Sequence, residues 1–302
     1  MIMASGLRTA RKLLLGREID QMIHAAGVSQ AEAGKLIEVG QSRINSIVAG
    51  SGTISAGDLK DLARGLGFDD EDYIETLLEL RRDNHKRGFW TTGYRRAYID
   101  ELRLLVDLET RADRIRETGA ELVPGLLQHP DYIRALHEPF VADLPEEGPT
   151  VDEYVQARVA RQENLTKRSA PEVHMVLSES CLRRTYGCDM VMYAQVLHLI
   201  ELSERHSNIL LQIMPFTHVV PGAGMEDRHL LIRVPSPGAA GDLEMAVVES
   251  QGELRYIDDK AALASRDRVF SRLAATALSE SDSRAFMQHI ARSLRSRPTV
   301  RA

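Results

Sequence analysis

The sequence has few of the features that mark disulfide-bonded, membrane-spanning, secreted or metal-binding proteins. Its 302 residues include only two cysteines, Cys181 and Cys188, which are too few for a disulfide framework. No apolar run is long enough to cross a bilayer, and the first residues lack the apolar core of a signal peptide. The ten histidines show no metal-ligand spacing. We therefore expect a cytoplasmic protein with no metal, no cofactor and no membrane partner.

Aromatic residues are also scarce, at 5% of the sequence, whereas hydrophobic residues reach 43% and fall mostly at helical spacing. A chain of this length can bury the cores of about two domains, and this composition favours helix. The net charge of −6 argues against non-specific coating of nucleic acid. It does not exclude a DNA-binding domain, because only one face of one domain has to be basic.

Catalytic motifs are missing as well. The sequence has no GxSxG elbow, no HExxH, no phosphate-binding loop and no GxGxxG in the context that each chemistry requires. We therefore expect that the chain is not an enzyme, and we keep an enzyme tethered to DNA only as an alternative.

The most informative segment is residues 29–50, SQAEAGKLIEVGQSRINSIVAG. Ser29 and Glu32 have the spacing of a capping box, which predicts the start of a short helix. Small residues at 33 and 34 allow a close helix crossing, Gly40 marks a turn, and a second helix begins at Gln41. Helical spacing also predicts helices over residues 11–26, 55–66 and 69–82. The N-terminal region is therefore predicted to be a five-helix bundle.

The second helix of this segment has an apolar stripe (Ile44, Ile47, Val48) opposite a polar stripe. Gln and Asn can bond the edge of adenine, Arg can bond guanine, and Ser is short enough to approach a base or a phosphate. This is the chemistry of a helix that enters the major groove. The segment resembles the lambda-repressor-like (XRE) helix-turn-helix family in Ser29-Gln30, in Gln41-Ser42, and in Ile44, Ile47 and Gly50.

The resemblance implies roles for individual residues. It implies that Gln30 contacts a backbone phosphate and supports Gln41, and that Arg43 contacts a base or a phosphate. It also implies that four residues of the second helix read bases: Gln41, Ser42, Asn45 and Ser46.

The pattern changes beyond the bundle. We place a DNA-binding domain at residues 1–82, a linker at 83–93, and a C-terminal regulatory and dimerisation domain at 94–302. The overall fold is expected to be α+β and helix-rich, with C-terminal helices covering a small sheet. We predict helices over residues 98–115, 151–167, 190–206, 260–277 and 280–294. We predict strands over residues 173–177, 209–214, 229–234, 244–249 and 253–257, the last two forming a hairpin at Gly252.

The C-terminal region is similar to the second domain of an actinobacterial group of XRE regulators described as antitoxin-like. The likeness includes residues 123–128, Arg158, Arg161-Gln162 and Pro215-Phe216. It implies a small acidic partner protein, whose gene often lies beside that of the regulator. Four charged residues either line a candidate regulatory pocket or form ion pairs that fix helices to the sheet: Glu109, Arg161, Glu179 and Glu249.

One recognition helix covers only a few base pairs. We therefore expect a homodimer on a pseudo-palindromic site of double-stranded DNA, with half-sites about one helical turn apart. The C-terminal domain is expected to take its input from a small acidic partner protein or a small-molecule effector. The alternative is an antitoxin-like protein whose main role is to sequester its partner, with autoregulatory DNA binding.

Overall fold

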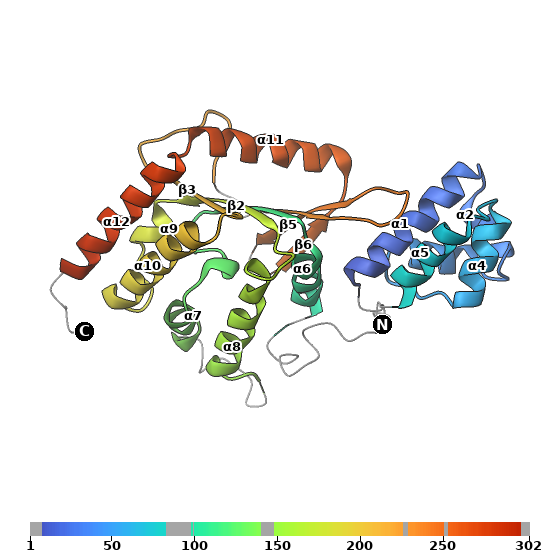
Figure 1. The fold of residues 1–302 in the computed structure, drawn as a ribbon, viewed down its shortest axis with the longest axis horizontal. Coiled ribbons are helices and arrows are strands. Elements are labelled where there is room, and N and C mark those ends of the chain that lie inside the picture. The colour runs from blue at the N-terminus through green and yellow to red at the C-terminus, as the bar shows by residue number, and fades with distance from the viewer. Residues whose placement is uncertain are drawn as a thin grey trace. The chain divides into compact units, whose positions relative to one another are not determined.

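The chain forms two compact units, here described from a computed structural model. Unit 1 is Met1–Arg111 with Val234–Leu243, and unit 2 is Ala112–Arg233 with Glu244–Ala302 (Figure 1). The chain therefore passes between the units three times. The predicted linker, residues 83–93, lies outside the described residues, so the predicted domain boundaries stay predictions. The structure describes residues 8–82, 98, 100–139, 148–225, 229–250 and 253–296.

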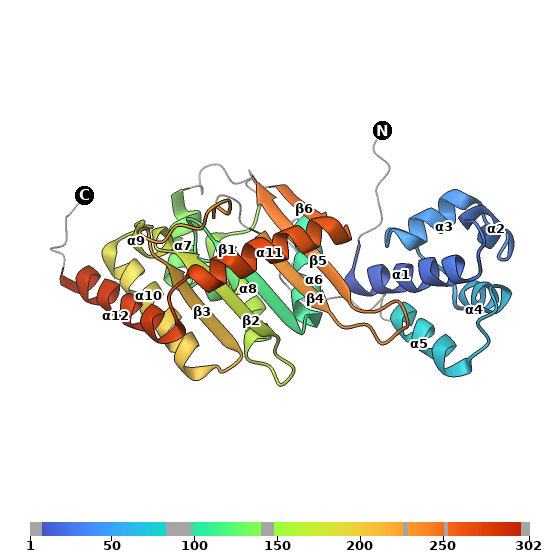
Figure 2. The same ribbon diagram turned by 90° about the horizontal axis from the view of Figure 1, so that it is seen from above.

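Five helices of unit 1 form the predicted bundle (Figure 2). Their apolar side chains, spaced three and four residues apart, converge on one core. Ile19, Met22, Ile44, Leu59 and Leu77 have no exposed surface. The helices are α1 (Ala10–Ala25), α2 (Gln30–Lys35), α3 (Gln41–Val48), α4 (Ala56–Gly65) and α5 (Glu71–Arg82).

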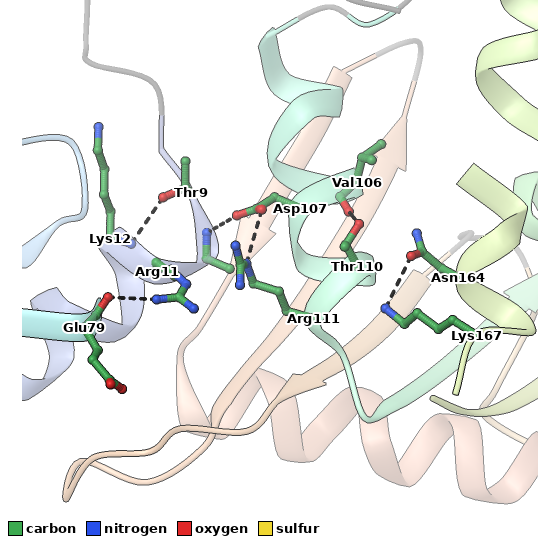
Figure 3. Close-up of polar contacts among 11 residues, drawn as sticks. Thr9, Arg11, Lys12, Glu79, Val106, Asp107, Thr110, Arg111, Asn164 and Lys167 are labelled. Atoms are coloured by element: carbon green, nitrogen blue, oxygen red, sulfur yellow. Dashed lines mark hydrogen bonds and ion pairs between the residues drawn. The ribbon is translucent and has the colours of Figure 1, made fainter. Parts of the chain in front are cut away.

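The ends of the first two helices follow local sequence signals. The hydroxyl of Thr9 accepts a 3.2 Å hydrogen bond from the amide of Lys12 and caps α1 (Figure 3). The predicted Ser29–Glu32 capping box is confirmed. Hydrogen bonds from the backbone and side chain of Ser29 hold the pKa of the Glu32 carboxyl below its usual value. Gly27, with φ of 67°, provides the left-handed residue that ends α1.

Unit 1 also contains α6 (Asp100–Arg111). We predicted that this helix would reach residue 115, which is wrong, because a strand begins at Arg114. In α6, Asp107 is 5% exposed and its carboxylate accepts a 2.6 Å hydrogen bond from the amide of Ala10 (Figure 3). Burial raises the pKa of Asp107, against the opposing effect of Arg111.

Unit 2 is built on a mixed sheet with the strand order β3-β2-β1-β4-β5-β6. The first three strands in this order are parallel, and β4 pairs antiparallel with β1. The five predicted strands are confirmed to within two residues at each end, whereas β1 was not predicted. The strands are β1 (Arg114–Gly119), β2 (Glu172–Ser178), β3 (Ile209–Met214), β4 (His229–Val234), β5 (Leu243–Ser250) and β6 (Glu253–Ile257). The predicted hairpin is present, since β5 and β6 pair antiparallel.

Helices cover both faces of this sheet (Figure 1). On one face, α11 (Lys260–Thr276) packs Phe270 and Leu273 on Val176, Met214, Leu231 and Ala246. The opposite face carries α7 (Pro130–His137), α8 (Val151–Gln162) and α10 (Asp189–Arg205), and α12 (Glu280–Ser296) packs beside α10. The remaining helical turns are η3 (Gly125–Leu127), η5 (Glu163–Leu165) and α9 (Ser180–Arg183). The helix-rich α+β fold is therefore confirmed.

None of the described helices is long and apolar enough to cross a membrane. No group of three or more His, Cys, Asp or Glu side chains in the described part of the chain is placed to hold a metal ion.

Candidate nucleic-acid interface

The turn between α2 and α3 requires glycine at position 34. A Cβ on Gly34 would lie 2.5 Å from the carbonyl oxygen of Val39 and 3.5 Å from Cγ1 of Ile44. The amide of Val39 donates to the carbonyl of Gly34 at 2.9 Å, which holds the turn closed. The predicted close approach of α2 and α3 is confirmed, and the backbone of the turn makes the tightest contact.

The two stripes of α3 are separated as the sequence predicts. Ile44 and Ile47 are 0% and 3% exposed and anchor the helix in the bundle core. The side of α3 away from the core is exposed to solvent at four positions: Gln41, Ser42, Arg43 and Asn45. An eight-residue helix with amide, hydroxyl and guanidinium groups on its open side can offer donors and acceptors to the edges of bases.

Arg43 is held by a residue that the sequence analysis did not single out. Its Nη2 atom donates hydrogen bonds to the carbonyl oxygen of Thr53 at 2.6 Å and to the Thr53 hydroxyl at 3.3 Å. One arm of the guanidinium is therefore engaged with the loop between α3 and α4. No sequence motif indicates this bond, because its main acceptor is a backbone carbonyl.

Ser46 lies at the edge of the exposed stripe and is half-buried. Its hydroxyl donates a 2.8 Å hydrogen bond to the carbonyl of Arg43, and its own carbonyl accepts from the amides of Ser51 and Gly52. A Cβ on Gly52 would lie 2.7 Å from Oγ of Ser46. Ser46 thus helps to end α3, and its contact with a base stays a prediction.

The N-terminus of α3 is open to an anion. Its N-cap is Gly40, which has no side chain to accept hydrogen bonds from the first-turn amides. Those amides and the positive end of the helix dipole favour a phosphate. Gln30, the half-buried first residue of α2, makes no described contact with Gln41. The phosphate contact and the support of Gln41 implied for Gln30 therefore stay predictions.

Several arginines of unit 1 are occupied with structure. Arg11 donates to the carbonyl of Glu79 at 2.8 Å, and Arg81 donates to the carbonyl of Ile54 at 2.7 Å. Arg17 donates to the carbonyls of Ala240 and Asp242. Lys35, by contrast, is exposed in the last turn of α2. The positive charge near α3 is modest, so any recognition of a DNA sequence would depend mainly on the polar side chains of α3.

The four residues of the candidate regulatory pocket lie on different elements. Glu109 of α6 and Arg161 of α8 are buried. Glu179 follows β2, forms an ion pair with Arg183 and accepts a 2.9 Å hydrogen bond from the amide of Phe216.

The remaining residue, Glu249, is exposed on β5. Three strand spacings, or about 14 Å, separate β2 from β5. Glu179 thus forms one ion pair of the kind that the alternative foresees, and a pocket shared by the four residues stays a prediction.

Two family models match the chain, each over a different part of the sequence. A model described as a helix-turn-helix domain matches residues 14–74, from α1 into α5. A model described as Domain of unknown function (DUF5753) matches residues 102–289, which is more than half of the chain. No curated protein and no solved structure matches. The chain therefore belongs to the family of the DUF5753 domain and carries a DNA-binding helix-turn-helix domain ahead of it.

Proposed function

We propose that this protein is a sequence-specific transcriptional regulator of the XRE type that binds operator DNA through α3 as a homodimer. The observation that carries the proposal is the separation of faces on α3. Ile44 and Ile47 are buried, while Gln41, Ser42 and Asn45 are exposed on a helix whose N-terminus is open to phosphate. Regulation, not catalysis, is the role that such a surface supports.

The direct test replaces two exposed amide side chains of α3. We expect Gln41→Ala with Asn45→Ala to weaken binding to the DNA upstream of the chain's own gene by about a hundredfold, since each bidentate base contact contributes about 1–3 kcal/mol. Fluorescence anisotropy at fixed salt measures the affinity, and circular dichroism checks the fold. The matched control is Gln21→Ala, an exposed position on α1. Unchanged binding by the double variant would reject the assignment of α3.

The dimer follows from the size of the reading surface. The eight residues of α3 extend over about 12 Å, which limits one helix to a few base pairs. We expect analytical ultracentrifugation to give twice the mass of the chain. Footprinting should give two protected half-sites about one helical turn apart. A monomer that occupies a single half-site with the same specificity would contradict the proposal.

Control through the C-terminal domain is the second part of the proposal, with either a small acidic protein or a small ligand as the input. The alternative is the antitoxin-like role, in which sequestering the partner is the main task. A gel shift with and without the product of the neighbouring gene separates them. For a regulator, adding the partner should change DNA binding. An antitoxin-like protein should still neutralise the partner when its DNA contacts are removed by Gln41→Ala and Asn45→Ala.

A further inference from the structure

A second candidate site lies in unit 2, between the sheet and α11. A cavity of about 430 Å³ opens there beneath the N-terminal half of α11, which Figure 2 shows crossing the sheet. This volume is within the range of small-molecule sites. Charged side chains form one part of its wall, and Leu231, Met245 and Leu263 form an apolar part.

Three arginines converge on this cavity from neighbouring strands. Arg114 and Arg116 are two residues apart on β1 and therefore lie on the same face of the sheet. Arg233 of β4 stands directly opposite Arg114 in the antiparallel register. Like charges in such a cross-strand pair are destabilising, so their presence on two inner strands calls for a compensating group.

Acidic neighbours compensate this charge only in part. Arg114 pairs with Glu244 at 3.3 Å, Arg116 pairs with Asp267, and Arg233 binds Asp113 through two hydrogen bonds of 2.9 and 2.7 Å. The fourth cation of the wall is Lys260, which is exposed and has no ion pair among the described residues. Of the four cations, Lys260 is therefore the one without an acidic partner in the described part of the chain.

Two buried polar atoms of the wall lack a hydrogen-bond partner in the described chain, a donor of Arg116 and the acceptor Oδ1 of Asp267. The Nε atom of Arg116 is buried and has no hydrogen-bond partner within the described chain. A guanidinium has five N–H donors, and the single 3.3 Å contact of Arg114 with Glu244 leaves most of them unused. A buried donor without an acceptor is unfavourable, and an anion entering the cavity would supply the missing acceptors.

The geometry points to a binding site for a small organic anion, with its carboxylate or phosphate group toward Arg114, Arg116 and Lys260 and its apolar body against Leu231 and Leu263. Two of the charged residues that line the cavity, Arg233 and Glu244, directly flank in sequence the segment Val234–Leu243, which belongs to unit 1. A role of this ligand as the effector rests on the proposed function, whereas its binding does not.

Isothermal titration of the full chain in the absence of DNA tests the site. The probes are 1-naphthyl phosphate and 1-naphthoate, which separate the two anionic groups, and neutral 1-naphthol. We expect at least one anion to bind and naphthol to bind about tenfold more weakly or not at all. Arg114→Gln and Lys260→Gln should each weaken the anion about tenfold, whereas Arg272→Gln, exposed on α11 outside the cavity wall, should not.

Lys260→Gln keeps the test decisive if Arg114→Gln perturbs the fold, because Lys260 is exposed. Three results would each overturn the inference. These are equal binding of naphthol, anion binding that neither variant changes, and the absence of binding by both anions. All three are independent of DNA binding, so this inference and the proposed function can fail separately.

Discussion

The carboxylate of Glu18, fully buried on α1, accepts a 2.8 Å hydrogen bond from the hydroxyl of Tyr73 on α5. It also accepts hydrogen bonds from the amides of Ala239 and Ala240 at 3.0 and 2.9 Å, and one from the hydroxyl of Ser236. Burial, reinforced by the hydrogen bond to Glu18, raises the pKa of Tyr73, so its hydroxyl remains a donor at neutral pH. One acidic side chain thus joins three separate segments of unit 1.

We expect Glu18→Gln to destabilise unit 1 by about 1–3 kcal/mol, because the amide NH₂ would face N–H donors in a buried place. The amides of Ala239 and Ala240 should then exchange with solvent faster, which hydrogen-exchange NMR measures residue by residue. The control is Glu75→Gln, which removes an exposed ion pair with Arg82 and should change stability by less than about 1 kcal/mol. Unchanged exchange at Ala239 and Ala240 would contradict the role of Glu18.

The close contact between Gly34 and Val39 predicts that a side chain at position 34 would lower the stability of the fold. Gly34→Ala improves helix propensity by about 1 kcal/mol, but it places a methyl group 2.5 Å from the carbonyl oxygen of Val39. We expect a net loss of about 1–3 kcal/mol by urea denaturation, together with weaker DNA binding. Gly57→Ala, in α4, is the matched control, since its Cβ would meet nothing nearer than Oγ of Ser55 at 3.8 Å. A more stable Gly34→Ala variant would show that the turn is not as tight as described.

The family resemblance implies either a base contact or a phosphate contact for Arg43, and its bond to Thr53 favours the phosphate contact. Because the guanidinium is held against the loop after α3, we expect Arg43 to contact a phosphate. Arg43→Gln should then weaken binding equally on all operator variants and reduce the slope of log K against log salt by about 1. A loss confined to one base pair of the operator would instead assign Arg43 to base reading.

Acidification should lower the free energy of unfolding of unit 2. Burial lowers the pKa of His137, His174 and His198 below 6.5. As the pH falls below 6.5, the unfolded chain binds protons that the folded chain does not, so the free energy of unfolding decreases until the lowered pKa values are passed. We expect a lower urea midpoint for unit 2 near pH 5.5 than near pH 7.5.

The variant His174→Gln shows how much of this pH dependence comes from His174. His174 shares a 2.7 Å hydrogen bond with Gln212 and meets the ring of Phe270 edge-on. His174→Gln retains a polar partner for Gln212 but cannot be protonated, so its stability should depend less on pH. A midpoint that rises on acidification in the unsubstituted protein would contradict this account.

Local patterns were enough to predict the bundle and the exposed face of α3, because helix spacing and the capping box depend on neighbours within a few residues. The strand β1 was missed for the opposite reason. Its sequence, RIRETG, is rich in Arg and Glu, which favour helix, and it becomes a strand only between β2 and β4. Its arginines line the cavity beneath α11, so this site was missed together with the strand.

The partners of Glu18 and Arg43 could not be predicted either. Ala239 and Ala240 lie more than 200 residues along the chain from Glu18, and the nearest acceptor of Arg43 is a backbone carbonyl. Contacts of this kind depend on how distant segments meet in the fold. The residue types involved do not indicate them. The four charged residues proposed for a regulatory pocket show the same limit, since sequence identified their charge but not which of them are neighbours.

The division of unit 1 between separate stretches of sequence bears on how the DNA-binding part can be isolated. A fragment ending at Arg82 would keep all five helices of the bundle but would lose Asp107, the acceptor for the amide of Ala10, and the donors from Ser236, Ala239 and Ala240 to Glu18. In such a fragment the amide of Ala10 would lack its described acceptor, and of the donors described here Glu18 would keep only the hydroxyl of Tyr73. The helix-turn-helix unit of this protein is thus built from segments that are distant in sequence. Fusing the bundle to another domain would therefore require including Asp107, Ser236, Ala239 and Ala240.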